Sequence, residues 1–182
     1  MKTIKVLFFT ILLSSAFLIT KAQPVKDNGQ LAVKGTKMVN EKGDVVMLKG
    51  ISYGWHNWWP RFYNESTVKW LAEDWNCEVL RAAMGVEPEK GYMNEPEWSR
   101  QKTEAIIKGA IDNDIYVIID WHSHGLHLEP AKDFFLEMAE KYGNYPNVIY
   151  EIFNEPVHDS WEDVKAYSIE VIKVIRDIDP DN

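Results

Sequence analysis

The chain has 182 residues, a length that allows one domain of ordinary size. Its 20 Lys and Arg against 28 Asp and Glu give a formal net charge of −8. An acidic surface repels nucleic-acid phosphates and anionic membranes, so neither is an expected partner. Cys77 is the only cysteine, which excludes an internal disulfide, and burial of apolar side chains must therefore hold the fold.

Residues 1–22 have the layout of a secretory signal peptide. Lys2 and Lys5 precede an apolar run, and small residues flank a cleavage point after Ala22. The apolar run of about 14 residues is short for a membrane span, which is the alternative interpretation. We expect a secreted protein, extracellular or periplasmic, whose folded domain occupies 23–182 and makes no membrane contact after cleavage.

After a short polar lead-in at 23–30, the sequence predicts a β-hairpin. Residues 31–54 are rich in apolar β-formers, with a turn at 40–44 and a strand near 48–52. Helices and strands then alternate to the end of the chain. The expected helices cover 64–75, 97–114, 130–142 and 161–179, and the expected strands cover 77–84, 115–120 and 147–153.

This alternation predicts parallel strands with helices packed outside them. An open doubly wound sheet is the alternative, but no Gly-rich phosphate loop follows the first strand. We therefore predict an α/β fold, a (β/α)8 TIM barrel, of which 23–182 form about the first four β/α units after the hairpin. A full barrel needs about 250 residues, so we infer that this segment is roughly the N-terminal half of a larger barrel. Its open edges and uncovered inner face favour dimers or aggregates.

Polar and aromatic residues follow each expected strand, at the rim where barrel enzymes place their sites. The tripeptide Asn-Glu-Pro occurs twice, and its two copies differ in context. The copy at 94–96 opens a helix, where Pro96 fits the first turn and the helix dipole favours the acid. The copy at 154–156 ends a strand, where a carboxylate is a candidate for proton transfer. For Asn154 and Glu155 to reach one site, the strand must end or bulge before them.

The run NVIYEIFNEP at 147–156 closely resembles the signature of glycoside hydrolase family 5, the retaining cellulases and related β-glycanases. LKGISYGWHNWW is similar to that family's first strand and aromatic loop, and VKWLAEDWNCEVLRAAMGVEPEKGY to its first helix and second strand. IYVIIDWH is similar to its third strand, and DPDN to the linker before its fifth. Several motifs in the same order are far more specific than one tripeptide.

The resemblance implies a role for five residues. Glu155 would be the catalytic general acid/base, and Asn154 would bond the 2-hydroxyl of the sugar. Arg81 would lie under the site and orient the nucleophile, His122 would lie near the −1 sugar, and Trp58 would stack on a sugar ring. Structural alternatives remain open at this point, namely a turn-forming amide for Asn154, an ion pair for Arg81 and a rim hydrogen bond for His122.

The resemblance also implies that the full-length protein is a retaining endo-β-1,4-glucanase, which hydrolyses β-1,4-glucan without a cofactor. Retaining cleavage needs two carboxyl groups about 5 to 5.5 Å apart. The family's nucleophile would lie beyond residue 182, and Glu151 lies too deep to replace it. We therefore expect the 182-residue chain itself to be inactive. Mannan, xyloglucan and mixed-linkage glucan are alternative substrates, and a non-catalytic sugar-binding fragment is an alternative function.

A metal-dependent hydrolase is a rival from another class. The segment HSHGLHLE contains three imidazoles and a carboxylate, contributed by His122, His124, His127 and Glu129. In barrel metal hydrolases the His-x-His pair belongs to the first strand, whereas here it follows the third. The resemblance to the cellulases also explains His122 without a metal, so we expect no metal site.

Overall fold

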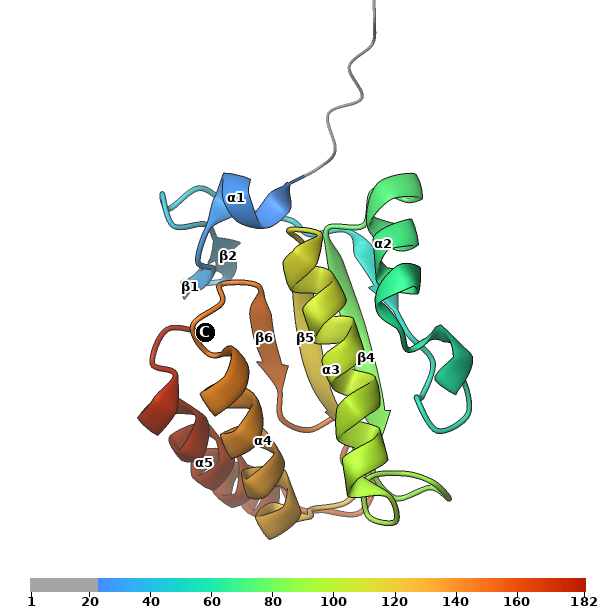
Figure 1. Ribbon diagram of the computed structural model, residues 1–182. Coiled ribbons are helices and arrows are strands. Elements are labelled where there is room, and N and C mark those ends of the chain that lie inside the picture. The colour runs from blue at the N-terminus through green and yellow to red at the C-terminus, as the bar shows by residue number, and fades with distance from the viewer. Residues whose placement is uncertain (1–22) are drawn as a thin grey trace, which may run out of the picture.

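The computed structural model describes residues 23–182 (Figure 1), and the proposed signal peptide lies outside the described residues. A four-stranded parallel sheet in the order β3-β4-β5-β6 forms its centre. The strands are Gly50–Ser52, Val79–Gly85, Tyr116–His122 and Val148–Glu151. Because the strands are parallel, their carboxyl ends meet at one edge of the sheet, which is the lower edge in Figure 1.

Four long helices pack against one face of this sheet. They are α2 (Glu65–Asp74), α3 (Pro96–Asp112), α4 (Leu128–Tyr142) and α5 (Trp161–Ile178). In Figure 1, α3 crosses in front of β4 and β5, and α4 lies beside α5. Every second residue of the strands packs with these helices in a single buried cluster. On the two central strands the residues of this cluster are Leu80, Ala82, Met84, Val117, Ile119 and Trp121.

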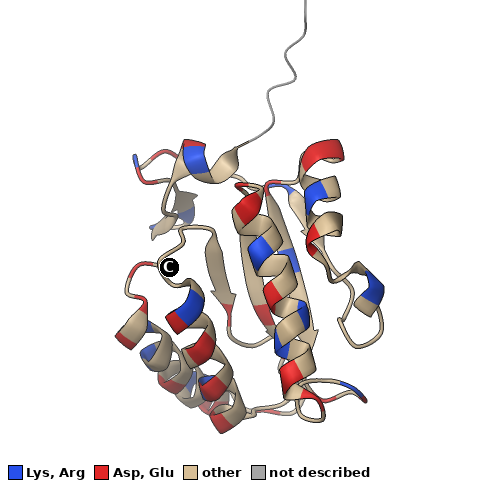
Figure 2. Ribbon diagram, in the orientation of Figure 1, with Lys and Arg blue, Asp and Glu red and all other residues tan. Residues whose placement is uncertain are grey.

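The other residues of the same strands form an inner face that is covered only in part within 23–182. Tyr116 and Asp120 are buried on it, whereas Val79, Ile118 and Ile149 are partly exposed. Charged side chains are common on the helices and rare on the strands (Figure 2). In the four-stranded sheet they are Arg81, Asp120 and Glu151, all on this inner face because side chains alternate along a strand. The layout confirms the predicted α/β fold and is that of a partial barrel. No helix within 23–182 is long and apolar enough to span a membrane.

Most predicted elements are present, with small shifts at their ends. Asn64 caps α2 by accepting from the backbone N–H of Thr67 at 2.9 Å. Helix α4 begins two residues earlier than predicted, so Pro130 lies inside its first turn. Strand β6 ends at Glu151, also two residues earlier than predicted.

The N-terminal segment differs from its prediction in two ways. The lead-in forms a short helix, α1 (Pro24–Asn28), whose Val25 is buried and donates its backbone N–H to the carbonyl of Asp114 at 3.3 Å. The antiparallel hairpin pairs β1 (Ala32–Lys34) with β2 (Lys37–Val39) around a turn at 35–36 that was not predicted. The predicted turn at 40–44 is also present, because Asn40 donates its backbone N–H to the carbonyl of Asp44 at 2.9 Å and Val39 forms an antiparallel bridge with Val45. Gly35 permits the turn at 35–36, because its φ of 63° suits the first central position of a two-residue hairpin loop.

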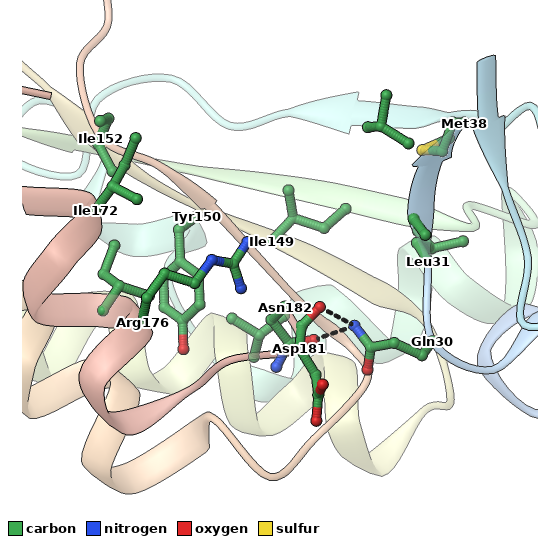
Figure 3. A pocket seen from close by; sticks show the side chains of 14 residues that line it. Gln30, Leu31, Met38, Ile149, Tyr150, Ile152, Ile172, Arg176, Asp181 and Asn182 are labelled. Atoms are coloured by element: carbon green, nitrogen blue, oxygen red, sulfur yellow. Dashed lines mark hydrogen bonds between the residues drawn. The ribbon is translucent and has the colours of Figure 1, made fainter. Parts of the chain in front are cut away.

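A groove of about 530 Å³ runs beside the outer edge of β6 (Figure 3). Its walls come from the hairpin, from β6 and from α5, with apolar side chains such as Leu31, Ile149 and Ile172. At one end Gln30 donates to the Asn182 side chain at 2.7 Å, which ties the hairpin to the last residue. This groove lies along the open edge of the sheet, apart from the residues predicted to form the site.

Candidate active site

Arg81 is the centre of a polar network on the inner face of the sheet. Its Nε and Nη2 donate to the two carboxylate oxygens of Glu151 at 2.7 and 2.6 Å, a bidentate pair. Nη2 also lies 2.9 Å from Asp120 Oδ2 and 2.9 Å from Asn154 Oδ1. The hydrogen bonds to Glu151 are the main reason that the pKa of Arg81 is raised further, so the guanidinium stays charged.

Asp120 links this network to His122. Asp120 Oδ2 lies 2.6 Å from His122 Nδ1, and the Asp120 side chain is fully buried. Burial raises the pKa of Asp120, while its hydrogen bond with His122 acts in the opposite direction. A carboxylate at Nδ1 favours the tautomer with its proton there, which leaves His122 Nε2 for a ligand.

Two stacked indoles lie next to the histidines. The rings of Trp55 and Trp58 are stacked and nearly parallel, with an interplanar angle of 3° and 4.5 Å between centroids. Trp55 also meets the ring of His122 edge-on at 4.5 Å and lies 5.3 Å from the ring of His124. Because Trp55 covers one face of Trp58, which is 59% exposed, only the opposite face of Trp58 is open to a sugar.

His56, which the sequence analysis did not single out, fixes the loop that carries these indoles. Its Nδ1 accepts from the backbone N–H of Gly85 at 3.1 Å, so its proton lies on Nε2, which is 2.9 Å from Ser99 Oγ. The ring is fully buried, and burial together with nearby Lys102 lowers the pKa of His56 to about 4. His56 is therefore neutral, and its hydrogen bonds link this loop to the end of β4 and to α3.

Glu155 lies at the edge of this arrangement, in the loop after β6. Its backbone N–H donates to the carbonyl of Ser123 at 3.3 Å, and its Oε1 lies 2.9 Å from His124 Nε2. The side chain is 65% exposed. Because β6 ends at Glu151, the required break before Asn154 is present. Asn154 contacts Arg81, whereas Glu155 contacts His124.

The five predicted residues thus belong to one connected group of side chains, which we call the rim cluster. It consists of Trp55, Trp58, Arg81, Asp120, His122, His124, Glu151, Asn154 and Glu155. The earlier Asn-Glu-Pro copy lies elsewhere, with Glu95 next to the start of α3 and Pro96 as its first residue.

The sequence analysis missed two further participants. Glu87, in the loop after β4, accepts at Oε1 from the backbone N–H groups of His124 and Gly125 at 3.0 and 3.1 Å. Glu151 was considered only as a substitute nucleophile, and it is the main partner of Arg81. The signal for such a partner was present, because a guanidinium in an apolar strand needs an acid.

The metal-hydrolase alternative gains no geometric support. Each of the three histidines in its proposed ligand set faces a different carboxylate, which is Asp120 for His122, Glu155 for His124 and Glu87 for His127. Glu129, the fourth proposed ligand, pairs with a lysine instead. Within 23–182, no group of three or more His, Cys, Asp or Glu side chains is placed to hold a metal ion.

The rim cluster lies at the carboxyl ends of parallel strands, where (β/α)8-barrel enzymes carry their active sites. Comparison with known proteins identifies the family. The family model described as cellulase, glycosyl hydrolase family 5, matches residues 39–182. The chain belongs to this family, which confirms the resemblance noted in the sequence.

The curated relatives are longer than this chain. Endoglucanase Z of Dickeya dadantii is 42% identical over 163 residues, which are 88% of this chain and 37% of that protein. An endoglucanase of Clostridium saccharobutylicum is 40% identical over 183 residues, covering 97% of this chain and 40% of that protein. The chain thus spans less than half the length of these curated relatives.

Solved structures are similar in fold as well as in sequence. A structure from Cytophaga hutchinsonii is 46% identical with a TM-score of 0.86, and the match covers 88% of this chain and 54% of that one. The catalytic domain of an endoglucanase from Thermobifida fusca is 37% identical with a TM-score of 0.83, at the same coverage of both chains. The chain therefore corresponds to about half of a family 5 catalytic domain.

Proposed function

We propose that this chain is the acid/base half of a retaining endo-β-1,4-glucanase that hydrolyses β-1,4-linked glucan. Membership of the cellulase family and the endoglucanase relatives support this proposal. A variant of the Thermobifida fusca domain was solved in complex with cellotetraose. The observation that carries the proposal is the position of Glu155 in the loop after β6, in one cluster with Arg81 and an exposed indole.

In the proposed reaction Glu155 acts twice. As a carboxylic acid it gives its proton to the leaving glycosidic oxygen, and as a carboxylate it then takes a proton from the attacking water. Asn154 accepts from Arg81 at Oδ1, so its amide N–H groups remain available to the 2-hydroxyl of the sugar. His122 offers Nε2 to the same ring, and the open face of Trp58 stacks on a neighbouring one.

The nucleophile is a second carboxylate about 5 to 5.5 Å from the first. Glu151 does not suit this role, because both of its oxygens already accept from Arg81. We therefore propose that the nucleophile comes from sequence outside these 182 residues and that the 182-residue chain hydrolyses no glucan. The chain can still bind oligosaccharides, and calorimetry with cellotetraose distinguishes binding from an inert chain.

The central test uses the protein extended past Asn182 to a complete barrel, with hydrolysis of a soluble cellulose derivative as the assay. Glu155→Gln removes the proton donor and keeps the size, and it should lower kcat/KM by roughly 10² to 10⁴. Undiminished hydrolysis by this variant would rule out Glu155 as the acid. Rapid hydrolysis by the unextended chain, abolished by Glu155→Gln, would show that the nucleophile lies within it.

Substrate and location are finer proposals. Parallel assays on mannan, xyloglucan and mixed-linkage glucan test the preference for β-1,4-glucan, and a higher kcat/KM on any of these would change the assignment. We also propose export by cleavage after Ala22. N-terminal sequencing of the secreted protein should begin at Gln23, and a protein retained in the membrane with residues 1–22 intact would contradict this.

A further inference from the structure

We propose that His124 is a positioning residue for the acid/base carboxyl group and that Glu87 holds His124 in place. This inference rests on the proposed role of Glu155. His124 has no role in the mechanism described above. It lies in the loop after β5, whereas Glu155 lies in the loop after β6 and Glu87 in the loop after β4.

Two contacts join the loops after β5 and β6. His124 Nε2 lies 2.9 Å from Glu155 Oε1, and the Ser123 carbonyl accepts from the backbone N–H of Glu155 at 3.3 Å. The Glu155 side chain is 65% exposed, so packing restricts it little. An acid catalyst must be held within hydrogen-bond reach of the atom it protonates. The imidazole of His124 is the side chain within 23–182 that supplies this restraint.

The orientation of His124 is itself fixed from two sides. Glu87 Oε1 accepts from the backbone N–H groups of His124 and Gly125 at 3.0 and 3.1 Å, and it lies 3.0 Å from His127 Nε2. These hydrogen bonds to a carboxylate are of the strong, charge-assisted kind. The ring of Trp55 lies 5.3 Å from the ring of His124 and comes from the loop after β3. Loops that follow four consecutive strands therefore converge on one carboxyl group.

This geometry also assigns the two oxygens of Glu155. With its proton on Nε2, His124 donates to Oε1 whether the carboxyl group is ionised or protonated. The catalytic proton is then carried by Oε2, the oxygen that His124 does not contact. Loss of the imidazole would leave the carboxyl group free to rotate, and misplacement of a catalytic group by about 1 Å can cost 10²-fold in rate.

The test compares substrates that differ in their need for an acid, using the protein extended past Asn182. Cellotetraose has a poor leaving group and needs the proton, whereas 2,4-dinitrophenyl cellobioside has a good one and does not. His124→Ala should lower kcat on cellotetraose by roughly 10-fold to 100-fold and leave KM near its original value. Cleavage of the aryl glycoside bond should change by less than about twofold.

Two further variants separate positioning from folding. His124→Gln keeps an N–H donor near the same place and should restore most of the lost rate on cellotetraose. His158→Ala is the matched control, because His158 is an exposed histidine in the same loop as Glu155. It should leave both substrates unaffected. If His124→Ala fails to fold, as judged by circular dichroism, the imidazole ¹⁵N NMR measurement described below decides instead.

The outcomes distinguish the two proposals. Equal losses on both substrates, or no loss on either, overturn the role of His124, while a Glu155→Gln variant inactive on cellotetraose keeps the proposed function intact. If Glu155→Gln hydrolyses cellotetraose normally, both proposals fail.

Imidazole ¹⁵N NMR of the 182-residue chain tests the contact between His124 and Glu155 without any activity. Glu155→Gln should shift the Nε2 resonance of His124 and not that of His158, and an unchanged His124 resonance counts against the inference.

Discussion

A single guanidinium organises the inner face of the sheet. Arg81 bonds both oxygens of Glu151, lies against Asp120 and donates to Asn154, with each of these hydrogen bonds shorter than 3 Å. The planar fork of arginine can serve several acceptors at once, which an ammonium group cannot do in the same geometry. The fixed amide of Asn154 is a direct consequence.

Arg81→Lys should therefore destabilise the chain although it keeps the charge. The lysine cannot form the bidentate pair, and two inward-facing carboxylates lose donors, so we expect a loss of about 2 kcal/mol in the free energy of unfolding. Urea titration measures it. Arg61→Lys, at an exposed arginine stacked on aromatic rings, is the control and should change stability by less than about 0.5 kcal/mol. Equal effects of the two substitutions would refute the special position of Arg81.

Because His56 is buried, we predict that the free energy of unfolding of the chain depends on pH. The folded-state pKa of His56, about 4, lies below the value of about 6.5 for an unfolded histidine, so only the unfolded state binds the proton between these values. The contribution of neutral His56 to the free energy of unfolding is complete above about pH 6.5. It is lost as the pH falls toward 4, at up to 1.4 kcal/mol per pH unit. Unfolding of His56→Asn, measured across this window, should depend less on pH than that of the unaltered chain. Parallel curves would contradict the assignment.

At the scale of elements, periodicity and capping predicted the helices and the parallel order of the strands. These signals are local, as in the Asn64 cap of α2. Two glycine-containing turns lie eight residues apart, at Gly35 and Gly43. The turn at Gly43 was predicted and is present, whereas the turn at Gly35 was missed because only the paired register of β1 and β2 reveals it. The lead-in helix was missed because its burial depends on a distant contact with Asp114.

The candidate site could likewise be predicted only in part, because its local signals are visible in the sequence and its distant contacts are not. A polar residue at the end of a strand is visible in the sequence, and the resemblance supplied the roles of Glu155 and Arg81. The partners of these residues are distant in the sequence. His124 lies 31 residues from Glu155, and Glu151 lies 70 residues from Arg81. Strand register and loop geometry bring such pairs together, and neither can be read from one sequence.

The loop after β3 makes a prediction about binding. Trp58→Ala removes the indole that offers its open face to a sugar, and it should weaken cellotetraose binding roughly fivefold to tenfold. Isothermal calorimetry measures the change. Trp75→Ala is the control, because Trp75 is equally exposed, at 59%, but ends α2 at the opposite end of the sheet. A similar loss in both variants would show that Trp58 is no subsite.

At the scale of the whole molecule, the sheet is open on two sides. Strands β3 and β6 are its edges, and the inner face carries half-buried Val79, Ile118 and Ile149. Edge strands with free backbone groups pair readily with other chains, and the apolar groove beside β6 adds to this tendency. Because the same fold that places the rim cluster leaves these surfaces open, we expect the chain to associate.

We predict that the chain without residues 1–22 self-associates at micromolar concentration, as measured by sedimentation velocity. Ile149→Lys places a charge on the inner face beside the open edge and should shift the distribution toward monomer. Ile169→Lys is the matched control on the outer surface of α5, where the isoleucine is 56% exposed, and should have little effect. A monomeric unaltered chain at these concentrations would contradict the prediction.

The most direct test of the central claim, that Glu155 is the acid/base, is chemical rescue in the protein extended past Asn182. Glu155→Ala should still form the glycosyl-enzyme from 2,4-dinitrophenyl cellobioside, because this leaving group needs no acid. Azide, a nucleophile that needs no base, should then accelerate turnover and yield β-cellobiosyl azide. Turnover that is unaffected by azide and gives only cellobiose, at the rate of the unaltered enzyme, would contradict the claim.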